Sequence, residues 1–161
     1  MEKIKIVQSE EEAKKVVDFL TTKEAFELEM NDFRQAARKE AVFGSLSDKH
    51  RRYWYCEDDK GKVTGAIGVA ETERKTGGYY IDYFAVHKDF RRLGIGSSLL
   101  QTAENFVKEC KGRFILIDTG DTDLFTAARA FYLKNGYTQV GHIPEYSDVG
   151  DGRIDLYKKI G

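Results

Sequence analysis

A short basic segment that contains two glycines, residues 91–97 (RRLGIGS), carries the strongest chemical signal in the sequence. It follows a strand-like pattern and precedes an amphipathic helical pattern, so it should lead into a helix. A helix start leaves backbone N–H groups unpaired and carries a positive partial charge, which favours anions. Gly94 and Gly96 lack a Cβ and let a ligand approach the backbone. The segment predicts a phosphate site; the alternative is a flexible loop whose arginines are solvated.

Two other phosphate motifs fit this sequence less well. A dinucleotide-binding fingerprint needs a small residue at the position that Leu99 occupies. The chain has no Gly-Lys-Ser or Gly-Lys-Thr triplet, which excludes a P-loop.

A carboxylate, Asp82, lies inside a segment whose aromatic and β-branched residues predict a strand over residues 79–86. Strict alternation would place Tyr80, Phe84 and Val86 on the same face as Asp82. Burying a carboxylate without a partner is costly, so its position needs an explanation. Asp82 is either a general base, acting directly or through water, or a structural ion pair or exposed residue.

The surrounding pattern predicts an α/β fold with a mixed sheet. Residues 79–118 read as a strand–helix–strand unit with parallel strands, because residues 114–117 are continuously apolar. Ser9 with Glu12 predicts a helix start, and a second helix would carry Phe26, Met30, Phe33 and Ala37 on one face. The remaining predicted elements are strands over residues 3–7, 53–57, 63–72, 137–143 and 153–159, and a helix over residues 126–134. The last two strands would form a closing hairpin with a loop over residues 147–152.

Two segments of the chain resemble the GNAT acyltransferase superfamily. Arg91-x-x-Gly94-x-Gly96 is similar to its pyrophosphate-binding signature, and residues 128–137 are similar to its helix with Phe-Tyr that ends in Asn-Gly-Tyr. The resemblance covers most of residues 79–137, whereas the first 50 residues match only in the order of elements. Arg92 departs from the glycine that many members carry.

The resemblance implies a single acyl-CoA-dependent acyltransferase domain over residues 1–161. The two parallel strands would splay at their carboxyl ends and hold the pantetheine arm of acetyl-CoA. The pyrophosphate would lie on N–H groups of the loop. The implied cofactor-binding residues are Phe84, Ala85, Val86, Arg91, Arg92, Leu93, Gly94, Ile95, Gly96, Ser97 and Phe131.

The resemblance also implies direct attack of an amine on the thioester. Tyr132 would protonate the leaving thiolate, and a backbone N–H near Val86 would stabilise the oxyanion. Asp82 is the candidate base. Tyr80 stands close to where some members carry a glutamate, so a base acting through a chain of waters is an alternative. Tyr132 could instead be a packing residue.

Composition limits the classes of partner. The 161 residues include 26 basic and 27 acidic side chains, so the chain offers little bulk attraction to nucleic acid or to an anionic membrane. No apolar run approaches the ~20 residues of a membrane span, and no signal-peptide core is present, so a cytoplasmic location is expected.

The two cysteines are expected to be reduced. The three histidines lack metal-ligand spacing, so no metal is expected.

The sequence does not identify the acceptor, because the segments expected to bind it are those that resemble the family least. A small-molecule or peptide amine is expected, and four acidic residues there weakly suggest a cationic acceptor: Glu27, Glu29, Glu145 and Asp148. Asp118, at a strand end, could bind substrate or cap a turn. A homodimer is possible from the family but undecided by the sequence. A non-catalytic acyl-CoA-binding module on the same fold is the alternative function.

Overall fold

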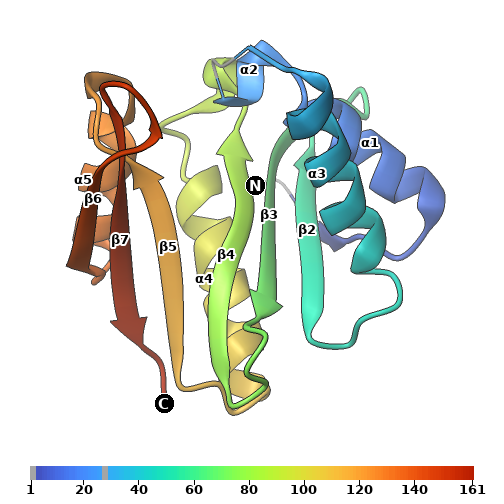
Figure 1. Ribbon diagram of the computed structural model, residues 1–161. Helices are drawn as coiled ribbons and strands as arrows, with labels where there is room; N and C mark the ends of the chain where they lie inside the picture. The colour runs from blue at the N-terminus through green and yellow to red at the C-terminus, as the bar shows by residue number, and fades with distance from the viewer. Residues whose placement is uncertain (1–2, 27–28) are drawn as a thin grey trace.

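Seven strands form one mixed sheet in the order β1-β2-β3-β4-β5-β7-β6 in the computed structural model, which describes residues 3–26 and 29–161 (Figure 1). The strands are β1 (Ile4–Ile6), β2 (Arg51–Glu57), β3 (Val63–Glu71), β4 (Gly78–Val86), β5 (Phe114–Gly120), β6 (Thr138–Asp148) and β7 (Asp151–Lys159). Among the strands of these described residues, β4 and β5 are the one parallel pair. This confirms the mixed α/β sheet that the sequence predicts.

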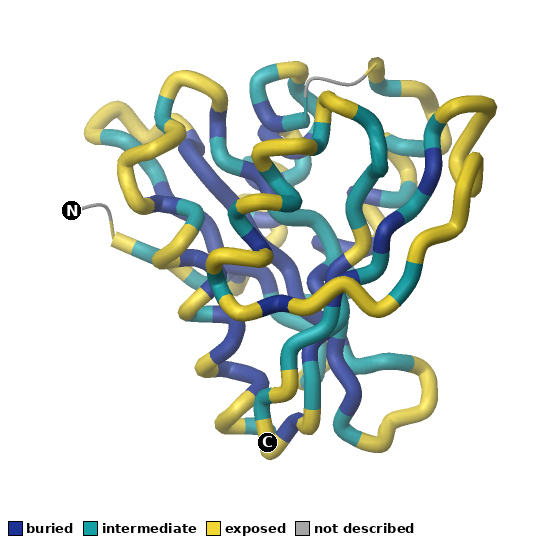
Figure 2. Tube along the Cα trace, turned by 90° about the vertical axis from the view of Figure 1, so that its left-hand side faces the viewer, coloured by how far each residue is buried: buried dark blue, intermediate teal, exposed yellow. Residues whose placement is uncertain are grey.

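Helices cover both faces of the sheet, but unevenly (Figure 1). The helices are α1 (Glu10–Leu20), α2 (Lys23–Phe26), α3 (Asp32–Gly44), α4 (Ile95–Glu109) and α5 (Thr126–Lys134), with short 3-10 turns η1 (Lys88–Phe90) and η2 (Asp123–Phe125). One apolar cluster joins α1 and α3 to β2 and β3, and a second joins α4 to the opposite face. Figure 2 shows the buried positions running through the middle of the molecule. In the part of the chain that is described, no helix is long and apolar enough to span a membrane.

The helix start predicted at Ser9 is confirmed, but the predicted second helix is wrong in its extent and its buried face. The Ser9 side chain accepts a hydrogen bond from the Glu12 N–H at 3.1 Å. Phe26 ends the short α2, and α3 begins after Asn31, whose side chain caps the Arg34 N–H at 2.8 Å. Phe33 is 80% exposed, because the buried face of α3 is instead formed by Arg38, Ala41 and Val42.

The closing hairpin has longer strands than the sequence predicts. β6 continues through Pro144 to Asp148, so the loop predicted over residues 147–152 shrinks to a turn around Val149 and Gly150. The register between β6 and β7 shifts between Ile143 and Asp148, where Glu145 has a φ of 55°. Pro144 has no N–H to donate to the β6–β7 hydrogen-bond ladder, and the irregular pairing at this point accommodates it.

The parallel pairing of β4 with β5 is short. It runs from Gly78 opposite Phe114 to Tyr80 opposite Leu116 and ends there. Beyond this point the two strands diverge towards their carboxyl ends (Figure 1). The divergence agrees with what the GNAT resemblance implies, and it leaves the β5 side of the second half of β4 without a strand partner.

Candidate active site

The loop that precedes α4 presents backbone N–H groups that have no acceptor among the described residues. Gly94 is the N-cap of α4, with φ of 86°, and the first i to i−4 bond of the helix runs from the Ser98 N–H to the Gly94 carbonyl at 3.1 Å. The N–H groups of the first helical turn therefore have no helical acceptor. A Cβ built at Gly94 meets nothing within 4 Å, so the space above the loop is open. The predicted phosphate loop has the geometry of an anion site.

The two arginines of this loop differ in their surroundings. Arg91 donates from Nε to the Val86 carbonyl at 3.0 Å and from Nη2 to the Ala25 carbonyl at 3.2 Å. These bonds tie the loop to the end of β4 and to α2, so Arg91 has a structural role in addition to its charge. Arg92 is exposed and has a φ of 65°, in the left-handed region. That conformation explains why glycine suits this position in the family signature.

The start of α4, the end of β4 and helix α5 meet at an aromatic cluster. The Phe84 ring lies 6.0 Å from the Phe131 ring and 6.3 Å from the Tyr132 ring, measured between centroids. A Cβ at Gly96 would lie 3.5 Å from Val86 Cγ2 and 3.6 Å from Phe131 Cζ. The fold thus brings together five of the predicted residues from three separate sequence segments.

The second half of β4 turns backbone groups towards the space that β5 vacates. The His87 N–H donates to the Thr64 carbonyl of β3 at 2.7 Å. Because backbone groups alternate along a strand, Ala85 also directs its N–H and C=O to β3, whereas Phe84 and Val86 direct theirs away from it. Of the three predicted strand residues, Phe84 and Val86 can therefore offer N–H groups to a ligand between β4 and β5, and Ala85 cannot.

Tyr132 of α5 is buried, with 8% of its surface exposed, and its hydroxyl has no hydrogen bond to any residue that the structure describes. Burial raises the pKa of Tyr132, and the negative charge of Asp118 raises it further. The phenol therefore stays protonated at neutral pH and is free to donate. Its ring also packs against Phe131 and Tyr137, at 5.5 and 6.1 Å between centroids.

A β-bulge in β4 corrects the predicted position of Asp82. Ile67 pairs with Phe84 but Val69 pairs with Ile81, so Asp82 and Tyr83 together oppose one residue of β3. The extra residue reverses the alternation. Phe84 and Val86 pack on the α4 side, whereas Tyr83 packs with the cluster on the α1 and α3 side. The prediction that Asp82 shares a face with Phe84 and Val86 is therefore wrong.

The Asp82 carboxylate is held by a buried tyrosine from β2. The Tyr53 hydroxyl donates to Asp82 Oδ2 at 2.7 Å, and Tyr53 is fully buried. Burial raises the pKa of Asp82, and the charge of Asp118 also raises it, while the Tyr53 hydrogen bond and the charge of Arg51 lower it. Since burial is the largest of these causes, Asp82 is a stronger base than an exposed aspartate. The sequence offered no sign of the Tyr53 contact.

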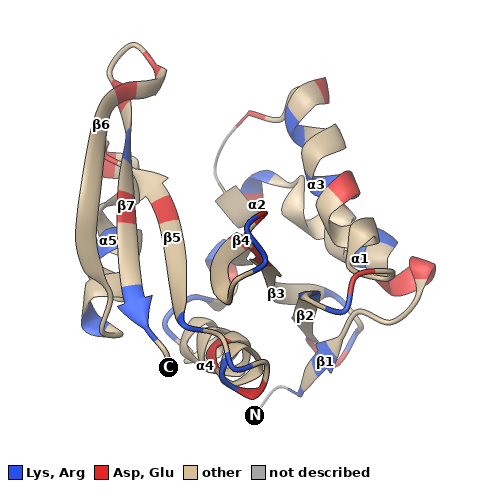
Figure 3. Cartoon of the chain, turned by 60° about the horizontal axis from the view of Figure 1, so that its bottom comes forward, with Lys and Arg blue, Asp and Glu red and all other residues tan. Residues whose placement is uncertain are grey.

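The two candidate catalytic residues lie within electrostatic range of the same carboxylate, Asp118, near the point where β4 and β5 separate. Its side chain is 60% exposed, with the Arg153 Nη2 at 4.0 Å. Asp118 pairs in register with Asp155 of β7, and acidic segments of β5 and β7 lie side by side in Figure 3. Arg153 also donates from Nε to Asp155 Oδ1 at 2.8 Å, so one arginine lies between these two carboxylates.

The acidic residues proposed from the sequence for the acceptor have other contacts. Glu29 forms an exposed ion pair with Lys23 at 2.9 Å. Glu145 accepts a hydrogen bond from the Gly150 N–H, and Asp148 accepts one from the Val149 N–H, each at 2.7 Å. Those two carboxylates stabilise the hairpin turn. The fourth, Glu27, lies outside the described residues.

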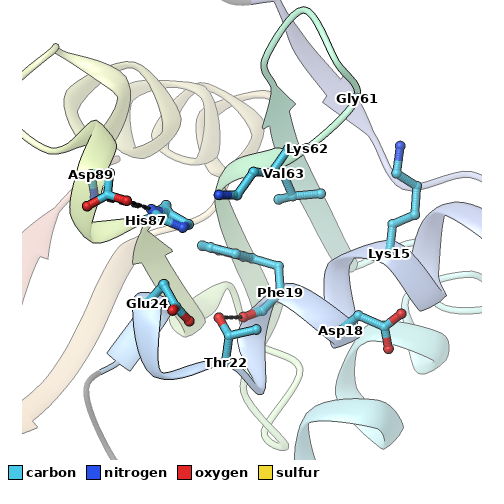
Figure 4. Close-up of a pocket in the computed structure, with 10 residues that line it drawn as sticks. All are labelled: Lys15, Asp18, Phe19, Thr22, Glu24, Gly61, Lys62, Val63, His87 and Asp89. Carbon is cyan, nitrogen blue, oxygen red and sulfur yellow. Dashed lines mark hydrogen bonds and ion pairs between the residues drawn. The ribbon is translucent and has the colours of Figure 1, made fainter.

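A separate cavity of about 430 Å³ lies between α1, α2, the β2–β3 turn and η1 (Figure 4). Its residues include Phe19, Lys62 and the buried His87, whose Nδ1 accepts a hydrogen bond from the Asp89 N–H at 3.1 Å. None of the site residues predicted from the sequence lines it. Among the described residues, no group of three or more His, Cys, Asp or Glu is placed to hold a metal ion.

Comparisons with known proteins agree with this geometry. The model of the "Acetyltransferase (GNAT) family" matches residues 18–137. An uncharacterised N-acetyltransferase of Methanocaldococcus jannaschii is 29% identical over 136 residues, which cover 83% of this chain and 82% of that protein. A protein assigned to the GNAT acetyltransferases from Desulfovibrio desulfuricans has a TM-score of 0.83 at 17% identity, with all of both chains covered. An aminoglycoside 6′-N-acetyltransferase complexed with coenzyme A has a TM-score of 0.77 at 20% identity, covering 99% of this chain and 97% of that one.

Proposed function

Because the chain belongs to the GNAT acetyltransferase family, we propose that it transfers an acetyl group from acetyl-CoA to a primary amine. The observation that carries the proposal is the early end of the β4–β5 pairing, next to the donor-rich start of α4 and to the Tyr132 hydroxyl, which has no hydrogen bond among the described residues. A thioester held there would have an anion site at one end and a proton donor at the other.

Acetyl-CoA binds along β4 in this proposal. The pyrophosphate accepts hydrogen bonds from the N–H groups of the loop and first helical turn, over residues 92–97, where the helix dipole adds attraction. The pantetheine arm takes the place of a strand beside Phe84 and Val86, whose backbone groups face away from β3. A structure of a related aminoglycoside acetyltransferase in complex with coenzyme A supports this choice of cosubstrate.

The acetyl transfer is a direct attack within a ternary complex. The Asp82 carboxylate takes a proton from the acceptor ammonium, directly or through water, and the free amine forms a bond to the thioester carbon. The Val86 N–H stabilises the oxyanion that develops on the carbonyl oxygen. When the C–S bond breaks, Tyr132 gives its proton to the CoA sulfur. The attacking nitrogen loses its second proton, through water, to the Tyr132 phenolate, and the tetrahedral centre collapses to a neutral amide.

The acceptor approaches from the side of the sheet that carries Asp82. That side is the face where α1 and α3 pack, which is opposite to the α4 face that carries Phe84 and Val86. Cosubstrate and acceptor therefore reach the reacting carbon from different directions, so neither blocks the other. A small-molecule or peptide amine fits this proposal.

Turnover of acetyl-CoA against a panel of amines tests the function. The panel contains a polyamine, an amino-acid amide, an aminoglycoside and a peptide with a free amino terminus. CoA thiol release must rise with one amine, and mass spectrometry must find that amine acetylated. If acetyl-CoA binds but no amine in the panel raises thiol release, the chain is better described as a non-catalytic acyl-CoA-binding module.

A further inference from the structure

The contact between Tyr53 and Asp82 spans the full width of one intervening strand. Tyr53 belongs to β2 and Asp82 to β4, and the Tyr53 hydroxyl reaches Asp82 Oδ2 at 2.7 Å. The other carboxylate oxygen, Oδ1, has no hydrogen bond to any described residue. One oxygen of the carboxylate is thus fixed, and the other is available to accept a proton.

Two features of the sheet make this contact possible. Gly68 of β3 pairs with Tyr53, and a Cβ at Gly68 would lie 2.1 Å from Tyr53 Cζ. The tyrosine ring therefore lies flat across β3 only because residue 68 has no side chain. Asp82 and Tyr83 both oppose Gly68 of β3, and cross-strand neighbours point to the same face, so Asp82 lies on the face of the Tyr53 ring. A side chain at position 68 would therefore prevent the hydrogen bond.

Several charged or titratable groups surround Asp82 besides Tyr53. Arg51 of β2 donates from Nη2 to the Tyr80 hydroxyl at 2.9 Å and attracts the carboxylate. Arg38 of α3 lies over the Tyr83 ring at 4.6 Å and attracts it more weakly, whereas Asp118 of β5 repels it. Of the residues that the structure describes, Tyr53 alone makes a direct hydrogen bond to the Asp82 carboxylate, and this bond fixes the orientation of the carboxylate.

We propose that Tyr53 is a positioning residue that holds Asp82 by Oδ2 and presents Oδ1 to the acceptor ammonium. This inference rests on the proposed acetyl transfer and on Asp82 as its base. A carboxylate held in one rotamer keeps its free oxygen in reach of the amine, and orientation of a reacting group contributes strongly to rate.

A second consequence concerns pH. A hydrogen bond from Tyr53 favours the charged form of Asp82, so its removal raises the pKa of Asp82 further. The base form exists only above that pKa. Without the hydroxyl, the acidic limb of the kcat/KM profile therefore moves to higher pH, and activity is lost first at the acidic end.

Replacement Tyr53→Phe tests the inference, because it removes one oxygen and keeps the ring. We expect the acidic limb of the kcat/KM profile to shift to higher pH by roughly one unit. We also expect kcat to fall about 10-fold and KM for acetyl-CoA to stay unchanged. Tyr55→Phe is the matched control. Tyr55 is a buried tyrosine of the same strand, and its hydroxyl donates to Glu12 Oε2 at 2.5 Å, outside the site. Its pH profile must match the wild type.

The outcomes separate this inference from the proposed function. If the wild type acetylates an amine but Tyr53→Phe keeps the wild-type pH profile and kcat, the acetyltransferase stands and the positioning role is overturned. A fully active Asp82→Asn variant would also overturn the positioning role and leave the acetyltransferase standing. If Tyr53→Phe does not fold, 3-fluorotyrosine placed at position 53 replaces it. Its more acidic phenol must move the acidic limb to lower pH, and an unmoved limb overturns the inference. A wild type inactive on every amine overturns both.

Discussion

The two sides of β4 place their functional groups by different means. On the α4 side, the candidate anion loop and Tyr132 come from two continuous segments. The loop is positioned by α4, which it precedes, and Tyr132 is positioned by α5, to which it belongs. On the opposite side, Asp82 is held by Tyr53 from β2 across a missing side chain on β3, and a bulge in β4 moves Phe84 and Val86 to the other face. The first arrangement is local in sequence, whereas the second exists only after three strands have paired.

This difference predicts different responses to mutation. A change on the α4 side affects one ligand contact or one proton transfer, because each group depends on its own helix. A change on the Asp82 side alters several groups together, because the carboxylate, the tyrosine and the bulge share one set of contacts. The following four variants test the two sides, in order of expected effect.

Asp82→Asn should lower kcat/KM by ~10²–10⁴-fold, the usual range for loss of a general base. The loss is greatest between the pKa of Asp82 and that of the amine, where the wild-type base is ionised and the acceptor is still protonated. Above the pKa of the amine the defect shrinks, because no proton has to be removed before attack. Full pH profiles of both proteins provide the measurement. An unchanged profile would show that Asp82 is structural.

Gly94→Val should weaken CoA binding by about 10–100-fold, because a β-branched residue is strained at a φ of 86° and its side chain enters the ligand space. Titration calorimetry with CoA measures the effect. Gly150→Val is the matched control, since Gly150 has a φ of 73° and equally open surroundings in the β6–β7 turn. The control should lose similar stability but keep its CoA affinity. Equal affinities in all three proteins would refute the assignment of the loop.

Tyr132→Phe should lower kcat about 10-fold and leave CoA affinity and Tm close to the wild type. The substitution removes only a hydroxyl that has no hydrogen-bond partner among the described residues, so packing is retained. Steady-state kinetics with a good acceptor, calorimetry and thermal unfolding provide the three readings. Unchanged kcat would make Tyr132 a packing residue. A parallel fall in CoA affinity or Tm would leave the acid role without support.

Tyr137→Phe should show the smallest effect on activity and a measurable effect on stability. The Tyr137 hydroxyl donates to Glu104 at 2.8 Å, and Glu104 is buried with Lys158 at 3.1 Å. Loss of one hydrogen bond to a buried carboxylate should cost about 1–3 kcal/mol of unfolding free energy. Chemical denaturation measures that cost, and kcat should stay within about twofold of the wild type. A large fall in kcat would place Tyr137 in the chemistry beside Tyr132.

Much of the fold follows from the sequence pattern. The helix predicted over residues 126–134 has the same bounds in the structure, and the strands predicted over residues 63–72 and 79–86 differ by one residue. Turn residues mark the ends of these elements: Asn135-Gly136 ends the helix, and residues 58–61 and 75–78 flank the two strands. The second helix was less predictable. Asn31 caps a new helix there, and this local hydrogen bond overrode the apolar pattern that links Phe26 to Phe33.

The sequence by itself was enough to predict the candidate anion loop and the candidate acid Tyr132, because glycines, a helix start and a tyrosine one turn before Asn135 depend on local geometry. The tertiary structure alone decided the surroundings of Asp82. One extra residue in the β4 ladder moves every following side chain to the other face, and nothing in residues 79–86 marks where that extra residue is placed. The partner of Asp82 lies 29 residues earlier and reaches it only across Gly68. Pairing register is a property of two strands together, so a single strand cannot reveal it.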